Sequence, residues 1–77
     1  MSLPEALIIT RQKAFMTQEA FAKKIHVTVA TINRWENGRS HPNLTAMKNI
    51  KEFCGKYNLD YEMIETEWLT AKLEAKK

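Results

Sequence analysis

The sequence is poor in the residues that build disulfides, tight turns and metal sites. Its 77 residues include one cysteine, two glycines and two prolines. A single thiol, Cys54, excludes an internal disulfide and fits a reducing cytoplasm. Together with His26 and His41 it makes a set too small and too scattered for a closed zinc site. The few Gly and Pro disfavour a many-stranded β fold, because such folds need frequent turns.

Long apolar runs and motifs for catalysis are also missing. No apolar run approaches the roughly 20 residues that span a bilayer, and the first residues do not form the basic-then-apolar pattern of a secretory signal. There is no glycine-rich phosphate loop and no histidine beside an obvious nucleophile. We therefore expect a cytoplasmic protein without membrane association that is not an enzyme. We also expect no metal, cofactor or small-molecule ligand.

The composition is that of a folded domain with an uneven charge. Hydrophobic residues make up 44% and charged residues 27%, and the net charge is +3, so disorder is not expected. Residues 1–56 hold nine Lys and Arg against four Glu, whereas residues 57–77 hold three Lys against five acidic residues. A basic body with a mildly acidic end favours a polyanionic partner on one side only.

Apolar residues recur with helical spacing along the whole chain, and period-two alternation is absent, so we expect an all-α fold. Thr17 and Thr28 are N-cap residues for the second and third helices, and Asp60 is a candidate for the fifth. Gly38 ends the third helix in a left-handed conformation. The predicted helices cover residues 4–14, 18–25, 28–37, 43–57 and 61–77. They form a single domain over 1–77, with its core over about 4–66.

The fourth predicted helix has one apolar stripe and the fifth has more than one. Residues of the fourth stripe step by three or four positions, which predicts a core face; they are Leu44, Met47, Ile50, Cys54 and Tyr57. The main stripe of the fifth helix comprises Tyr61, Ile64, Trp68, Ala71 and Ala75. Leu69 and Leu73 lie beside it. Because this exceeds what one core contact needs, we interpret Trp68, Leu69 and Leu73 as a candidate dimer or partner surface.

The connection between the second and third helices is the informative feature. Only His26 and Val27 separate the second helix from the cap Thr28, and two short helices joined this tightly cross steeply, as in a helix-turn-helix. Five apolar residues would fill the core that the two helices share: Phe21, Ile25, Val27, Ile32 and Trp35. The other residues of the third helix are left for solvent or a ligand: Val29, Ala30, Thr31, Asn33 and Arg34.

Residues 4–66 resemble the helix-turn-helix domain of the Cro/C1-type (XRE-like) repressors. The resemblance rests on three stretches of sequence: Thr17-Gln18-Glu19, Thr31-Ile32-Asn33-Arg34-Trp35-Glu36-Asn37-Gly38 and Pro42-Asn43-Leu44. It implies a five-helix, lambda-repressor-like DNA-binding domain, extended here by a longer C-terminal helix. It also implies that the third helix reads double-stranded DNA in the major groove.

The resemblance assigns roles to individual positions. Four match positions that contact base edges: Val29, Ala30, Asn33 and Arg34. Seven match positions that contact phosphate around the recognition helix: Gln18, Thr28, Thr31, Asn37, Arg39, Ser40 and His41. Arg11 and Glu36 match a pair that forms a buried, structural ion bridge in relatives.

Four positions depart from the family's pattern. His26 and Phe15 stand where relatives commonly have Gly after a helix, and a left-handed backbone costs a non-Gly residue on the order of 1 kcal/mol. Val29 and Ala30 are apolar where relatives often carry hydrogen-bonding side chains. This leaves fewer side chains for direct base readout.

The leading hypothesis is a prokaryotic or phage transcriptional regulator, a repressor that binds operator DNA as a homodimer and is nucleoid-associated when bound. Two alternatives stay open at the level of sequence. One is the N-terminal DNA-targeting module of a larger restriction-modification or helicase protein. The other is an antitoxin or protein-interaction adaptor that holds a partner through its C-terminal helix.

Overall fold

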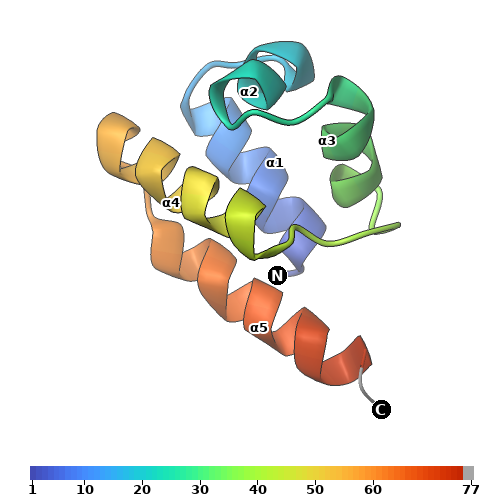
Figure 1. The fold of residues 1–77 in the computed structure, drawn as a ribbon. Coiled ribbons are helices and arrows are strands. Elements are labelled where there is room, and N and C mark those ends of the chain that lie inside the picture. The colour runs from blue at the N-terminus through green and yellow to red at the C-terminus, as the bar shows by residue number, and fades with distance from the viewer. Residues whose placement is uncertain (76–77) are drawn as a thin grey trace.

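Five α-helices and no strand make up residues 1–75, which are the residues that the computed structural model describes. They are α1 (Leu3–Lys13), α2 (Gln18–Lys24), α3 (Val29–Glu36), α4 (Leu44–Tyr57) and α5 (Tyr61–Ala75). The pair α2 and α3 lies at one end of the molecule, α5 lies at the opposite side, and α1 and α4 lie between them (Figure 1). The prediction that the last helix runs to residue 77 falls in part outside the described residues.

Side-chain caps fix where the helices begin. Thr17, Thr28 and Asn43 accept hydrogen bonds from the backbone N–H three residues ahead, at 3.1, 3.1 and 2.8 Å. Asp60 does the same for Met63 at 3.3 Å. These bonds satisfy N–H groups that have no partner within the helix.

Helix α1 begins one residue earlier than predicted, because Ser2 caps it. Ser2 and Glu5 form a reciprocal capping box, in which the Ser2 hydroxyl accepts from the Glu5 N–H and the Glu5 carboxylate accepts from the Ser2 N–H. The spacing Ser-x-x-Glu is the sequence signal for this motif. The predicted start at residue 4 did not include this cap.

The core lies where all five helices meet. The edge of the Phe21 ring faces the Phe53 ring with centroids 5.1 Å apart, and this contact joins α2 to α4. Aromatic pairs favour such an arrangement. The largest fully buried side chains are Leu7, Thr10, Phe21, Ile25, Ile32, Ile50, Cys54 and Ile64.

The interpretation of Leu44 as a core residue was wrong, because its side chain is 73% exposed. The buried face of α4 is formed by Ala46, Met47, Ile50, Phe53 and Cys54. At 3.6 residues per turn, Leu44 points about 120° away from the mean direction of this face. The predicted stripe therefore included a residue that lies outside the buried face, and it omitted Phe53, which belongs to that face.

Trp68 belongs to the core and not to an exposed surface. Its side chain is only 7% exposed, and its Nε1–H donates to the Pro42 carbonyl at 2.7 Å. This bond ties α5 to the loop between α3 and α4. Of the three residues in the predicted partner surface, Leu69 and Leu73 are the exposed ones, at 49% and 67%.

Within the described residues, no helix is both long and apolar enough to pass through a bilayer.

Candidate nucleic-acid interface

The connection between α2 and α3 is short and held by the backbone. Ile25 ends α2, and the Val27 N–H donates to the Ala22 carbonyl at 3.0 Å. His26 lies between them with φ at +62°, in the left-handed region. Thr28 then caps α3. The chain therefore reverses over the few residues between the helices, and α3 packs across α2.

Helix α3 has one face in the core and one face in solvent. Ile32 and Trp35 are 1% and 4% exposed, and they anchor the helix to the body. The four side chains that the sequence assigned to base contacts all lie on the outward part of the helix: Val29, Ala30, Asn33 and Arg34. The tight packing of Ile32 and Trp35 thus determines which side chains α3 presents.

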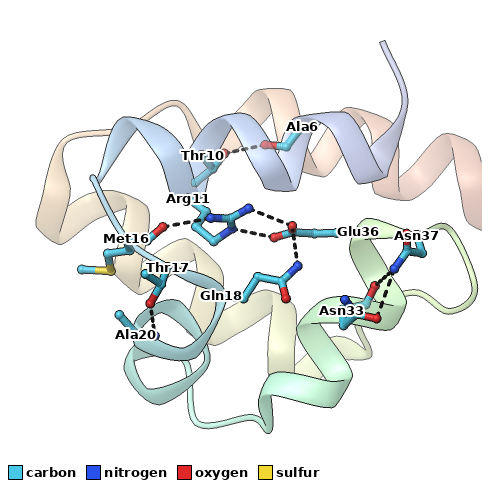
Figure 2. A network of polar contacts seen from close by, with 10 residues as sticks. All are labelled: Ala6, Thr10, Arg11, Met16, Thr17, Gln18, Ala20, Asn33, Glu36 and Asn37. Atoms are coloured by element: carbon cyan, nitrogen blue, oxygen red, sulfur yellow. Dashed lines mark hydrogen bonds and ion pairs between the residues drawn. The ribbon is translucent and has the colours of Figure 1, made fainter.

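Several outward polar side chains are held by neighbours on the same helix. The Thr28 and Thr31 hydroxyls lie 2.9 Å apart, and Arg34 Nη2 lies 3.4 Å from Thr31 Oγ1. The Asn37 amide nitrogen donates to the Asn33 backbone carbonyl at 2.9 Å and to the Asn33 side-chain oxygen at 3.1 Å (Figure 2). The exposed polar groups are therefore partly ordered in the free protein.

A groove of about 500 Å³ runs between α3 and the beginning of α4. It brings together five of the predicted contact residues: Thr28, Thr31, Arg34, Ser40 and His41. Its lining contains no Asp or Glu, but includes one Arg and two His. Such a lining suits an anionic ligand electrostatically.

Other residues of this groove were not among the predicted contacts. Asn43, which caps α4, and Thr45 and Asn49 of α4 also line the groove. Asn49 donates its amide to the Ile25 carbonyl at 3.1 Å, which links α4 to the turn. The sequence predicts that the fourth helix begins at Asn43, but it carries no signal that α4 lies beside α3.

The three remaining predicted phosphate contacts do not line this groove. Arg39 is exposed in the loop after α3, and Asn37 caps the end of that helix. Gln18 is half-buried at the beginning of α2.

Arg11 of α1, Gln18 of α2 and Glu36 of α3 form a polar network between these three helices (Figure 2). Arg11 Nε donates to Glu36 Oε2 at 2.8 Å, and Arg11 Nη2 donates to Glu36 Oε1 at 3.0 Å. The two side chains are 14% and 5% exposed, so water screens the pair little. The hydrogen bond to Glu36 raises the pKa of Arg11 above its ordinary value, although desolvation opposes this.

No group of three or more His, Cys, Asp or Glu in the described part of the chain lies close enough together to hold a metal ion. Cys54 is buried, and burial together with the charge of Asp60 raises the pKa of its thiol to about 11. The thiol therefore stays protonated at neutral pH and behaves as a small apolar core residue.

Two curated proteins are similar in sequence to part of this chain. The HTH-type transcriptional activator BcrR of Enterococcus faecalis is 34% identical over 53 residues, which cover 69% of this chain and 26% of BcrR. Antitoxin HigA-2 of Vibrio cholerae is 33% identical over 48 residues, which cover 62% of this chain and 46% of the antitoxin. The aligned part is thus less than half of either relative. No solved structure matches the chain significantly.

The helix-turn-helix family model matches residues 7–61, a span that contains α2, the turn, α3 and α4. The all-α architecture of the described residues agrees with the fold expected from the sequence. The chain belongs to the helix-turn-helix family, as its resemblance to the Cro/C1-type domains implied.

Proposed function

We propose that this chain binds double-stranded DNA, with α3 in the major groove, and serves as a transcriptional regulator. The observation that carries the proposal is the orientation of α3. Its apolar side is buried through Ile32 and Trp35, and Asn33 and Arg34 are exposed on the other side. The groove beside it contains no acidic side chain, which favours the approach of phosphate.

The four outward residues of α3 supply base contacts in this proposal. Arg34 has the fork geometry for the O6 and N7 acceptors of guanine, and Asn33 has the amide that pairs with adenine. Val29 and Ala30 offer methyl groups to the methyl of thymine. Arg34 and Asn33 therefore carry most of the choice of sequence.

The residues around α3 hold the DNA backbone. Phosphate contacts position a protein on the duplex and supply the salt-dependent part of its affinity. We assign them to Gln18, Thr28, Thr31, Asn37, Arg39, Ser40 and His41. Gln18 lies at the N-terminus of α2, where free backbone N–H groups also favour an anion.

We further propose that the regulator acts on a promoter as a homodimer. Two-fold pairing would place the two α3 helices about 34 Å apart, one turn of DNA. Leu69 and Leu73 on α5 are the candidate contacts between copies, because they are apolar and exposed. Analytical sedimentation of the chain with and without DNA measures its oligomeric state. Leu69→Glu with Leu73→Glu should shift any dimer to monomer, whereas an unchanged dimer would place the contact elsewhere.

Selection of bound duplexes from a random library, at two salt concentrations, tests the main proposal. We expect one enriched motif and an affinity that falls as salt rises, because base contacts and phosphate contacts both act. Salt-dependent binding without an enriched motif would reject base readout by α3. Absence of binding at low salt would reject the DNA-binding function itself.

A second candidate function is that of an antitoxin, which the partial match to Antitoxin HigA-2 favours. In this alternative Leu69 and Leu73 hold a partner protein instead of a second copy. Purification of the chain from its native host distinguishes the two. A stoichiometric second protein that is lost in the Leu69→Glu, Leu73→Glu variant would support the antitoxin.

A further inference from the structure

Asn33 and Asn37 lie one helical turn apart at the end of α3, and they are joined through the Asn37 side chain (Figure 2). The Asn37 amide nitrogen donates to the Asn33 backbone carbonyl at 2.9 Å and to the Asn33 side-chain oxygen at 3.1 Å. Both residues are exposed. Two polar side chains are therefore bonded to each other on the surface that α3 presents, where each could otherwise bond to water.

The backbone decides which way the Asn37 amide faces. An asparagine amide has one oxygen acceptor and one nitrogen with two N–H donors. A reversed Asn37 amide would place its oxygen against the Asn33 backbone carbonyl, and two acceptors would meet without a proton between them. The nitrogen therefore faces Asn33. Its two N–H groups match two acceptors there, the backbone carbonyl and the side-chain oxygen.

The same reasoning fixes the amide of Asn33. Its oxygen faces the Asn37 nitrogen, because a reversed Asn33 amide would bring two donors together. This contact leaves both N–H groups of the Asn33 nitrogen unused, together with one of the two lone pairs on its oxygen. A side chain held in this way loses less conformational freedom on binding than one that moves freely.

The end of α3 does not need the side-chain bond to complete its backbone pairing. The Asn33 carbonyl already accepts the Asn37 backbone N–H at 3.0 Å, as in a regular helical turn. The N–H groups of Gly38 and Arg39 donate to carbonyls of the last turn at 3.1 and 2.9 Å. The main consequence of the Asn37 side-chain contact is therefore the orientation of the Asn33 amide.

We propose that Asn37 is a positioning residue for base readout, which holds the Asn33 amide so that its nitrogen and one oxygen lone pair face the DNA. This inference rests on the proposed DNA-binding function. It replaces the phosphate contact assigned to Asn37, because both N–H groups of the Asn37 amide are already matched by acceptors of Asn33.

The held amide suits adenine and disfavours cytosine. In the major groove adenine offers the N7 acceptor beside the N6 donor, whereas cytosine offers only the N4 donor. The Asn33 nitrogen can donate to N7 while the remaining lone pair of its oxygen accepts from N6. Against cytosine the same nitrogen would meet another donor. We therefore expect adenine to be preferred over cytosine at the position that Asn33 reads.

The test measures this base preference in a double-mutant cycle. Duplexes are selected with the native chain, and the position read by Asn33 is the one whose preference is lost in Asn33→Ala. Affinities for duplexes with adenine and with cytosine at this position are compared among the native chain, both single Ala variants and the double variant. Both residues are exposed, so the variants should keep the fold. A selected motif that is unaffected by Asn33→Ala would overturn the proposal.

Asn37→Ala should lower the preference for adenine over cytosine about three- to tenfold, the effect of one hydrogen bond. In the Asn33→Ala background it should change this preference less than twofold, because no amide remains to be positioned. An unchanged preference with uniformly weaker binding is the effect of a lost phosphate contact, and it would overturn the proposal while leaving DNA binding intact. So would an effect that persists without Asn33. Absence of binding by the native chain would overturn the proposal together with the proposed function.

Asn37→Asp gives a second readout, because it should reverse the Asn33 amide. A carboxylate only accepts hydrogen bonds, so it would draw the Asn33 nitrogen toward itself and turn the oxygen to the DNA. The added negative charge should weaken binding to every duplex. The ratio of affinities should nevertheless move further toward cytosine than in Asn37→Ala, because the oxygen can accept from N4. A ratio no closer to cytosine than that of Asn37→Ala would overturn the orientation that the proposal assigns.

Discussion

Helices α3 and α5 both place one side in the core and one side in solvent, yet their outer sides differ in chemistry. The solvent-facing side of α3 carries Asn33 and Arg34, next to a groove without acidic residues. The solvent-facing side of α5 carries Leu69 and Leu73, and this helix is rich in acidic residues. Each helix is anchored by one buried tryptophan, Trp35 or Trp68. The two helices are thus anchored in the same way, but α3 presents a surface suited to a polyanion, whereas α5 presents an apolar and acidic surface.

The largest expected effect comes from removing the two anchors. Trp35→Ala and Trp68→Ala should each lower the free energy of unfolding by about 3–5 kcal/mol, because each leaves a cavity in a small core. Trp68→Ala also leaves the Pro42 carbonyl without its donor. Urea denaturation followed by circular dichroism measures both. A loss below about 1 kcal/mol for either variant would show that its tryptophan does not anchor its helix.

An effect of intermediate size should distinguish the solvent-facing side of α3 from that of α5. Arg34→Ala should reduce the preference for a selected duplex over a scrambled one by about 1–3 kcal/mol, because a bidentate base contact is lost. Lys72→Ala on α5 removes the same charge from the other side and should leave the preference unchanged. Titrations with both duplexes measure the ratio of the two affinities for each variant. A uniform loss of affinity in Arg34→Ala would instead assign Arg34 to phosphate.

The smallest effect concerns the left-handed residues that precede the two helices. His26 and Asn58 have φ of +62° and +57°. His26→Gly should stabilise the protein by about 0.5–1 kcal/mol, since relief of the strained backbone exceeds the added freedom of the unfolded chain. Asn58→Gly should change stability by less, because Asn adopts this conformation readily. Thermal denaturation of both variants measures the difference. An equal gain from both would mean that the histidine backbone is not specially strained.

Local features of the fold could be predicted because they depend on residues close in sequence. Thr17, Thr28 and Asp60 mark helix beginnings through their own side chains, and Gly38 and His26 mark chain reversals through their backbone. The positive φ at His26 agrees with what the resemblance implied, because relatives commonly have Gly at this position. These signals located α2 and α3 to within one residue.

Features that depend on contacts between distant residues could not be predicted as well. Leu44 has the helical spacing of a core residue, but whether it is buried depends on which side of α4 meets the other helices. Trp68 is buried because it reaches Pro42, 26 residues away. The bond between Gln18 and Glu36 joins two helices, and no local pattern in the sequence records it. Each of the two residues was assigned a separate role, and the structure joins them.

The contrast between α3 and α5 can be tested residue by residue with backbone amide spectra. Adding the selected duplex to labelled protein should shift signals from residues 17–20 and 28–41 most strongly, while signals from residues 61–75 stay near their positions unless copies pair. Largest shifts on α5, with α3 unaffected, would contradict the assignment of α3 as the DNA-reading helix.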